Sequence, residues 1–173
     1  MMALFHRRDA PPATALAALS KGERVVSWAQ TGSDDVVLAT ARGLWWPEAD
    51  GLRVIGWEFV DKAIWRDGRL TVIEADLVDD LLLIDRSPES VDLSTPRDLP
   101  ATVRKRVESN VVRSELRAVG GGVARFVARR IPGRDGVVWW VRLEGGLVDS
   151  DEVRSQLDAE RAALQAQWTK AQL

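Results

Sequence analysis

Short apolar runs separated by turn residues fill the first half of the chain. These runs predict strands near residues 24–29, 35–40, 43–46, 52–55, 60–66, 69–74 and 78–84. Asp67-Gly68 is a two-residue hairpin signal, because both residues tolerate a positive φ. Strands this short would leave unpaired edges in a flat sheet. The pattern therefore predicts a curled antiparallel sheet, either a barrel or a sandwich.

A predicted loop at residues 85–98, rich in Ser, Pro and Asp, separates these strands from a helix. Asp98 is a suitable N-cap and Pro100 fits the first turn. The apolar residues Leu99, Val103 and Val107 fall on one face of this helix. The segment thus predicts an amphipathic helix that covers part of the first sheet.

The second half predicts another meander and a final helix. Its three strands are expected at residues 111–119, 123–131 and 137–143, joined by glycine-rich turns at 120–122 and 132–136. The final helix, about 150–171, begins either with Ser150 as N-cap or with the capping-box spacing Asp149-x-x-Glu152. Its apolar stripe consists of Val153, Leu157, Leu164 and Trp168. Near the N-terminus, residues 11–19 predict a short helix with Leu16 and Leu19 on one side.

Two short sequence motifs in the first half resemble those of a known family. Residues 37–45, VLATARGLW, resemble the T-x-x-R-L strand pair of bacterial pleckstrin-homology-like (PH-like) domains, and residues 55–63, IGWEFVDKA, look like their I-P-W-x-x-I strand. Gly56 stands where proline is usual, and Gly43 occupies the arginine position unless Arg42 fills it. The resemblance covers about residues 22–110. The whole arrangement is also similar to uncharacterised small proteins of high-GC bacteria.

The residue pattern and the resemblance together predict an α+β protein in three parts. Residues 1–21 form an N-terminal tail and a short helix, and residues 22–110 form a PH-like seven-stranded bent antiparallel barrel with a capping helix. Residues 111–173 add a three-stranded antiparallel meander and a C-terminal helix packed on the barrel. The family implies a binding or scaffolding role and transfers no catalytic residues.

The residue inventory argues against an enzyme. The chain has no cysteine and one histidine, His6, which removes thiolate and imidazole metal sites and a histidine base. Asp34-Asp35 and Asp79-Asp80 are interpreted as turn residues, because adjacent strand residues point to opposite faces. Residues 120–122 join two strands and do not enter a helix, as a phosphate-binding loop would. We therefore expect a protein without catalytic residues, metal or cofactor.

The N-terminus and the hydropathy indicate a cytoplasmic protein. No run reaches the roughly 18–20 apolar residues of a membrane span, and residues 1–12 lack the order of a signal peptide. Residues 2–5, followed by Arg7 and Arg8, allow weak peripheral association with an anionic membrane. A simple tail is the alternative for this segment.

Two adjacent tryptophan pairs raise the question of a contact surface. In a strand, one ring of each pair must face away from the other. Trp46 and Trp140 are therefore candidate contact residues for a protein partner or for self-association. The alternative is that the C-terminal helix or the second meander covers these rings.

Charge is distributed unevenly along the chain. Residues 23–96 carry 7 cationic and 15 anionic side chains, whereas residues 97–142 carry 11 and 4. Candidate nucleic-acid contacts in the basic meander are Arg113, Arg117, Arg125 and Arg129. With a tryptophan nearby, such a face would suit RNA or single-stranded DNA. The competing interpretation is that these arginines pair internally with the acidic half, which leaves protein–protein interaction as the main functional expectation.

Overall fold

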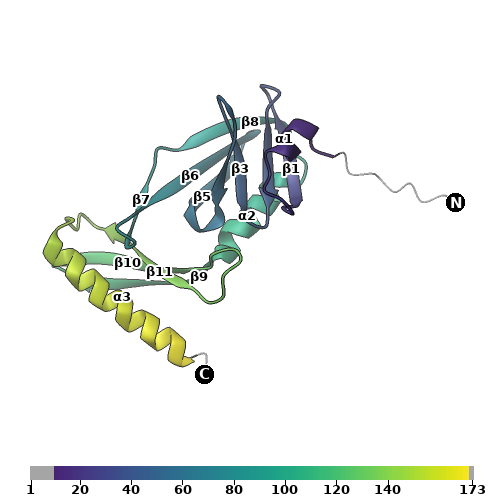
Figure 1. Ribbon diagram of the computed structural model, residues 1–173. Helices are drawn as coiled ribbons and strands as arrows, with labels where there is room; N and C mark the ends of the chain where they lie inside the picture. The colour runs from purple at the N-terminus through teal and green to yellow at the C-terminus, as the bar shows by residue number, and fades with distance from the viewer. Residues whose placement is uncertain (1–9, 172–173) are drawn as a thin grey trace.

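The computed structural model describes residues 10–171 and has an α+β architecture. Within this range, 11 strands form one large, open and mostly antiparallel sheet, which divides into two lobes (Figure 1). The first lobe, which keeps the name barrel lobe from the prediction although its sheet is open, contains β1 (Val25–Thr31), β2 (Val36–Thr40), β3 (Gly43–Glu48), β4 (Gly51–Gly56), β5 (Val60–Arg66), β6 (Arg69–Val78), β7 (Leu82–Asp85) and β8 (Glu89–Thr95). Its helical elements are α1 (Ala13–Ala17), the 3-10 turn η1 (Trp57–Phe59) and α2 (Leu99–Asn110).

The meander lobe contains β9 (Val111–Val119), β10 (Gly122–Arg129), β11 (Val138–Glu144) and α3 (Asp151–Ala171). The strand order is β4-β3-β2-β1-β8-β6-β7-β11-β10-β9, and β5 pairs with β6 outside this path. The lobes join where β7 runs parallel to β11 through the pair Leu82 and Val141. α3 extends along the meander on the side away from the barrel lobe (Figure 1). The two lobes are therefore connected by a narrow strip of sheet and by side chains.

The predicted loop at residues 85–98 is wrong in part, because β8 occupies half of it. β8 pairs with β6 on one side and with β1 on the other. In β8 only Leu93 is buried and Val91 is half-buried, so its apolar alternation was too short to see in the sequence. The predicted strand at residues 78–84 is also wrong in part. Asp79 and Asp80 have positive φ and turn the chain between β6 and β7, as expected for solvated turn residues.

The main helix predictions are confirmed. Leu99 and Val103 of α2 are buried in the barrel core, and Val107 packs against it. Asp98 occupies the N-cap position of α2, but its carboxylate accepts a hydrogen bond from Ser27 Oγ at 2.6 Å and caps no amide. Residues 153, 157 and 164 of α3 are buried, and residue 168 packs beside them.

Two details of the other helices refine the predictions. At the start of α3, Ser150 is the cap, because its Oγ accepts a hydrogen bond from the Val153 amide at 3.3 Å. Asp149 bonds to Arg154 and forms no capping box. In the first helix, Ala15 is buried, whereas Leu16 is largely exposed. Leu19 packs against the same cluster as Ala15, so the expected packing face is confirmed for Leu19 and wrong for Leu16.

The four rings of the two adjacent tryptophan pairs lie in four separate apolar clusters. Trp46 lies in the barrel core beneath α2, and Trp45 points to the other face of β3, where Ala15 of α1 covers it. Trp139 packs under α3, and its ring meets that of Trp168 edge to face with centroids 6.5 Å apart. The fourth ring, residue 140, lies in a small cluster at the junction of the lobes. Each tryptophan pair thus fills two cores, one on either side of its strand.

Gly43 marks a close approach between β3 and β4. It lies opposite Gly56, and a Cβ at position 43 would collide with the carbonyl oxygen of Ile55. A side chain as large as arginine has no room there. This contact gives a steric reason for the glycine at this position of the family-like motif.

Candidate functional site

A groove of about 690 Å³ lies between β5 and α2 at one end of the barrel lobe. Apolar residues of both walls face it: Ala63, Ile64 and Trp65 from β5, and Pro100, Ala101 and Val107 from α2. Ile64 and Trp65 are 39% and 40% exposed. Large apolar side chains that stay this exposed beside a groove are typical of a binding surface.

β5 presents a free backbone edge to this groove. Within residues 10–171 the strand pairs with β6 alone. In an antiparallel ladder, only every second residue exchanges backbone hydrogen bonds with its neighbour. Since Arg66 and Arg69 close the two-residue turn between the strands, the amide and carbonyl groups of Ala63 and Trp65 point away from β6. One more strand can therefore be hydrogen-bonded to β5.

The rim of the groove carries three cationic and two carboxylate side chains: Lys62, Arg97, Arg104, Asp61 and Glu108. Both carboxylates are paired within the protein. Glu108 accepts a hydrogen bond from Arg104 Nε at 2.8 Å, and Asp61 contacts arginines of the meander lobe. Arg97 lies with its guanidinium 4.0 Å from the centre of the Trp28 ring. The groove is thus apolar at its floor and weakly basic at its rim.

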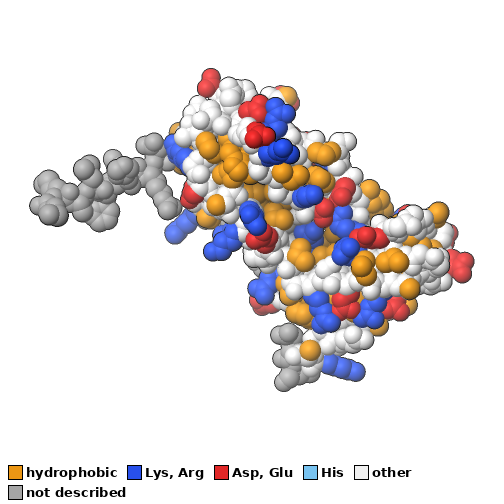
Figure 2. All heavy atoms as spheres, turned by 180° about the vertical axis from the view of Figure 1, so that it is seen from behind, with side chains coloured by type: hydrophobic (Ala, Val, Ile, Leu, Met, Phe, Trp, Pro, Cys, Tyr) orange, Lys and Arg blue, Asp and Glu red, His pale blue; other side chains and the backbone are white. Residues whose placement is uncertain are grey.

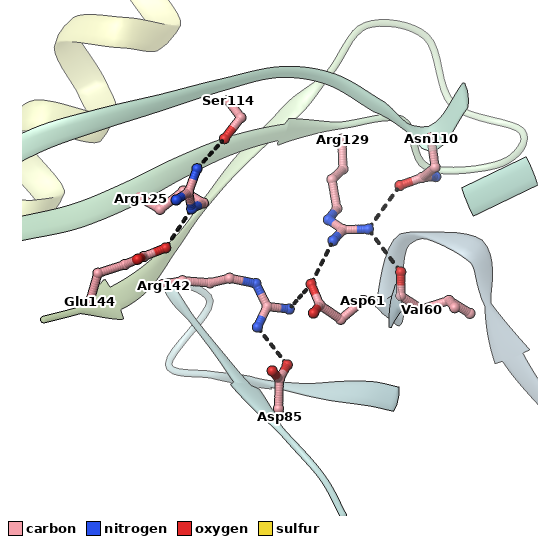
Figure 3. Close-up of polar contacts among 9 residues, drawn as sticks. All are labelled: Val60, Asp61, Asp85, Asn110, Ser114, Arg125, Arg129, Arg142 and Glu144. Atoms are coloured by element: carbon pink, nitrogen blue, oxygen red, sulfur yellow. Dashed lines mark hydrogen bonds and ion pairs between the residues drawn. The ribbon is translucent and has the colours of Figure 1, made fainter. Parts of the chain in front are cut away.

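Asp61 lies between two arginines of the meander lobe (Figure 3). Its Oδ1 is 2.8 Å from Arg142 Nη2 and 3.4 Å from Arg129 Nη2. Arg142 Nη1 in turn reaches Asp85 of β7 at 2.5 Å. This network joins β5 and β7 of the barrel lobe to β10 and β11 of the meander lobe.

Arg129 connects both walls of the groove. Its Nη1 donates to the Val60 carbonyl at the start of β5 at 3.2 Å, and to Asn110 Oδ1 at the end of α2 at 3.4 Å. The side chain is 3% exposed, and its Nε has no hydrogen-bond partner among the described residues. Burial, and then the like charge of Arg142, lower the pKa of the Arg129 guanidinium. One buried arginine of the meander lobe therefore sets the spacing between β5 and α2.

Glu58, a third acidic residue near this network, has too few favourable contacts to offset the burial of its carboxylate. Burial raises the pKa of the Glu58 carboxyl in η1, against smaller opposing effects that include the charge of Arg129. Its Oε2 is buried and has no hydrogen-bond partner among residues 10–171. The ionised form of Glu58 therefore costs stability.

Glu58→Gln is expected to stabilise the protein at pH 7 and to leave its stability nearly unchanged near pH 4. A carboxyl whose folded-state pKa lies above the unfolded value destabilises the fold when it is ionised, and this cost disappears as the pH falls through both values. Thermal unfolding at the two pH values measures the difference. Asp135→Asn, in an exposed loop, is the control and is expected to change little. A loss of stability at pH 7 would show that attraction to Arg129 outweighs burial.

The two predicted contact tryptophans are buried. Trp46 is 2% and Trp140 is 4% exposed. The interpretation that these rings form an exposed contact surface is therefore wrong. The alternative, that the C-terminal helix or the second meander covers them, is also wrong for Trp46, which is buried in the core of its own lobe beneath α2. Trp140 is covered by Phe59, whose ring stacks on it with centroids 5.4 Å apart. The cover comes from the barrel lobe because this end of β11 faces η1 and β6.

The four predicted nucleic-acid contacts do not share a face: Arg113 and Arg117 lie on one side of the meander, and Arg125 and Arg129 on the other. Directly opposite residues of a ladder project to the same face. Arg117 is opposite Ala124, which is buried beneath α3, so Arg125 projects to the other side. The expectation of a common arginine face is therefore wrong. The turn at residues 120–121 sets a register in which Arg117 lies opposite Ala124 and not opposite Arg125, so the arginines of β9 and β10 project to different faces.

Each of these arginines also has a carboxylate partner. Arg113 and Arg117 both reach Glu115 at 2.5 Å, and Arg125 contacts Glu144. Lys and Arg side chains are interspersed with Asp and Glu on the face that Figure 2 shows. Internal pairing is thus observed for all four, although of these only Arg129 crosses to the acidic barrel lobe. The arrangement offers no continuous arginine row for a phosphate backbone.

Sequence reasoning missed the residues of the groove, above all Trp65 and Ala101. Trp65 belongs to a strand of mixed polar and apolar residues, and nothing in that strand marks it as an edge. One weak signal was available, because Lys62, Ile64 and Arg66 alternate with residues expected in the core. An apolar Ile64 on the polar side of such a strand suggests a contact surface.

Comparison of the chain with protein-family models, with curated proteins and with solved structures gives no match. Among the described residues, no helix has the length and apolar character needed to cross a membrane. The same residues contain no group of three or more His, Cys, Asp or Glu side chains placed to hold a metal ion. The predicted membrane-contacting segment at residues 2–8 lies outside the described residues.

Proposed function

We propose that the protein is a cytoplasmic, non-catalytic interaction module that binds an extended segment of another protein along β5, in the groove between β5 and α2. On this proposal, residues 22–110 are a PH-like barrel, with α2 as the helix that closes one end. The observation that carries the proposal is the free edge of β5 beside exposed Ile64 and Trp65. Addition of a peptide strand to a sheet edge is a recurrent mode of recognition, with backbone hydrogen bonds for affinity and side-chain pockets for specificity.

The shape of the groove favours a single extended strand as its occupant. α2 forms the opposite wall, through Pro100, Ala101 and Val107. On this proposal the added strand runs along the free edge of β5 beside α2, where a second folded sheet would collide with the helix. The apolar floor favours a segment with apolar residues at alternate positions, and the weakly basic rim favours an acidic flank.

The test uses a displayed library of random 12-residue peptides, followed by calorimetry with the selected peptide. We expect saturable binding that Ala63→Pro weakens by about tenfold or more, because proline removes an outward amide without removing a bond to β6. Ala101→Arg is expected to block the groove sterically. Leu16→Arg, at an exposed apolar residue on α1, is the matched control and should leave the affinity unchanged.

Two outcomes would overturn the proposal. One is a library that yields no peptide with saturable affinity. The other is a selected peptide whose affinity is the same for wild type, Ala63→Pro and Ala101→Arg, since that peptide binds elsewhere. Circular dichroism of each variant confirms that the fold is intact before the affinities are compared.

A further inference from the structure

β9 is a second exposed sheet edge, at the end of the meander lobe. It is 9 residues long, and in the described part of the chain it pairs with β10 alone. It contains no proline, and Leu116 on it is 55% exposed, more than any other large apolar side chain of the sheet. A long edge strand of this kind is a template for pairing with another strand unless it is protected.

The backbone groups available on β9 follow from its register. Val119 and Gly122 close the two-residue turn at residues 120–121, so they form a hydrogen-bonded pair. By alternation, residues 113, 115 and 117 bond to β10, whereas residues 114, 116 and 118 present amide and carbonyl groups to solvent; a bulge at Val112 ends this alternation. An added strand must therefore pair through the even-numbered residues.

We infer that β9 pairs antiparallel with β9 of a second copy of the chain, about a two-fold axis at Ser114. This arrangement satisfies the alternation, because Ser114 then faces Ser114 of the second copy as a hydrogen-bonded pair. It also places Arg113 of each copy opposite Glu115 of the other, in the closer non-hydrogen-bonded pairs. The charge sequence Arg-Ser-Glu at residues 113–115 is thus complementary to itself across the axis.

Leu116 projects to the opposite face of the strand from Arg113 and Glu115. In this register the second strand runs beside Leu116 and covers part of it. Val112 lies at a bulge and packs against the cluster under α3, so the register rests on the pairs of opposite charge. The inference is independent of peptide binding at β5, because the two edges lie in different lobes.

The other free edges do not offer this complementarity. β5 lies beside α2, which would collide with the sheet of a second copy. β4 is shorter, and its Arg53 is bound by Glu48, Glu74 and Glu89 of its own lobe. β9 lies at the open end of the sheet, where a second meander can continue it.

Sedimentation equilibrium over a range of concentrations tests the dimer. We expect the mass to rise from 19.2 kDa toward twice that value. Arg113→Glu and Glu115→Arg should each weaken self-association roughly tenfold, because each places like charges opposite one another twice. An equimolar mixture of the two variants should recover the wild-type affinity, since opposite charges then face each other again. Recovery in the mixture cannot come from damage to either monomer.

Cysteine cross-linking tests the register, because the chain has no native cysteine. Ser114→Cys should form a covalent dimer on mild oxidation, since facing residues of a hydrogen-bonded pair lie about 5.5 Å apart at Cα. Leu116→Cys is equally accessible but four residues from its counterpart in this register, and should remain monomeric. A monomer at all concentrations, no recovery in the mixture, or preferential cross-linking of Leu116→Cys would overturn the inference.

Discussion

Replacement of Asp61 by asparagine is expected to destabilise the protein by about 3 kcal/mol, the lower end of the range for breaking a buried ion pair. Asparagine keeps the shape of the side chain but removes the charge that faces Arg129 and Arg142. Arg129 is 3% exposed, so its charge cannot be hydrated instead. Asp61 itself is 27% exposed, which is why the lower end of the range applies.

Urea unfolding followed by circular dichroism measures this loss, and the melting temperature is expected to fall by roughly 6–12 °C. Asp67→Asn is the matched control. Asp67 pairs with Arg66 at 3.2 Å, but both side chains are more than 80% exposed, so the expected change is within about 0.5 kcal/mol. An equal and small effect of the two substitutions would show that the junction network does not stabilise the fold.

A second substitution separates the charge effect from simple loss of a contact. Arg129→Met in the Asp61→Asn background removes the buried charge that was left unpaired, and is expected to restore much of the lost stability. The double variant also loses the contacts of Arg129 to Val60 and Asn110. Those contacts join the two walls of the groove. The double variant is therefore expected to bind the selected peptide more weakly than wild type, even though its stability recovers.

The local elements could be predicted from the sequence because their signals are local. Leu99 and Val103 repeat at helical spacing, and their burial in α2 follows from that spacing alone. Asp67-Gly68 specifies its hairpin through backbone conformation, and both residues have the predicted positive φ. β8 was missed for the same reason, because its one buried residue, Leu93, gives no periodicity.

Contacts between distant segments could not be predicted in this way. Whether Arg125 shares a face with Arg117 depends on the register that the turn at residues 120–121 imposes, and a shift of one residue reverses the answer. Burial of Arg129 depends on Asp61, which lies in another lobe and 68 positions away. The charge asymmetry indicated that the two halves attract, but it does not specify which residues pair.

The groove is a product of topology more than of composition. Trp65 and Ala101 become its walls only because β5 stays unpaired on one side and α2 lies across from it. Seven tryptophans other than Trp65 are present in the chain; five of them are buried in apolar clusters, and the other two pack against those clusters. The number of tryptophans suggested a contact surface but not which ring forms it. The position of the free sheet edge determines that Trp65 is the ring exposed to a partner.

Trp140→Ala is expected to destabilise the protein by about 3–5 kcal/mol, the usual cost of removing a large buried aromatic side chain. Trp140 is 4% exposed, stacks on Phe59 and packs with Ala75 and Leu83 of the barrel lobe. The cavity would open at the junction of the lobes, where the surrounding sheet cannot collapse to fill it.

The same chemical change at Trp65 provides the control for that prediction. Trp65 is 40% exposed at the groove, so Trp65→Ala is expected to cost about 1 kcal/mol or less in stability but to weaken peptide binding. Urea unfolding of both variants measures the stabilities, and the slope of the transition adds a second readout. A lower slope for Trp140→Ala alone would mean that the meander lobe has separated from the barrel lobe, because the slope scales with the surface exposed on unfolding. Equal stability loss in the two variants would contradict the assignment of Trp140 to the core and of Trp65 to the surface.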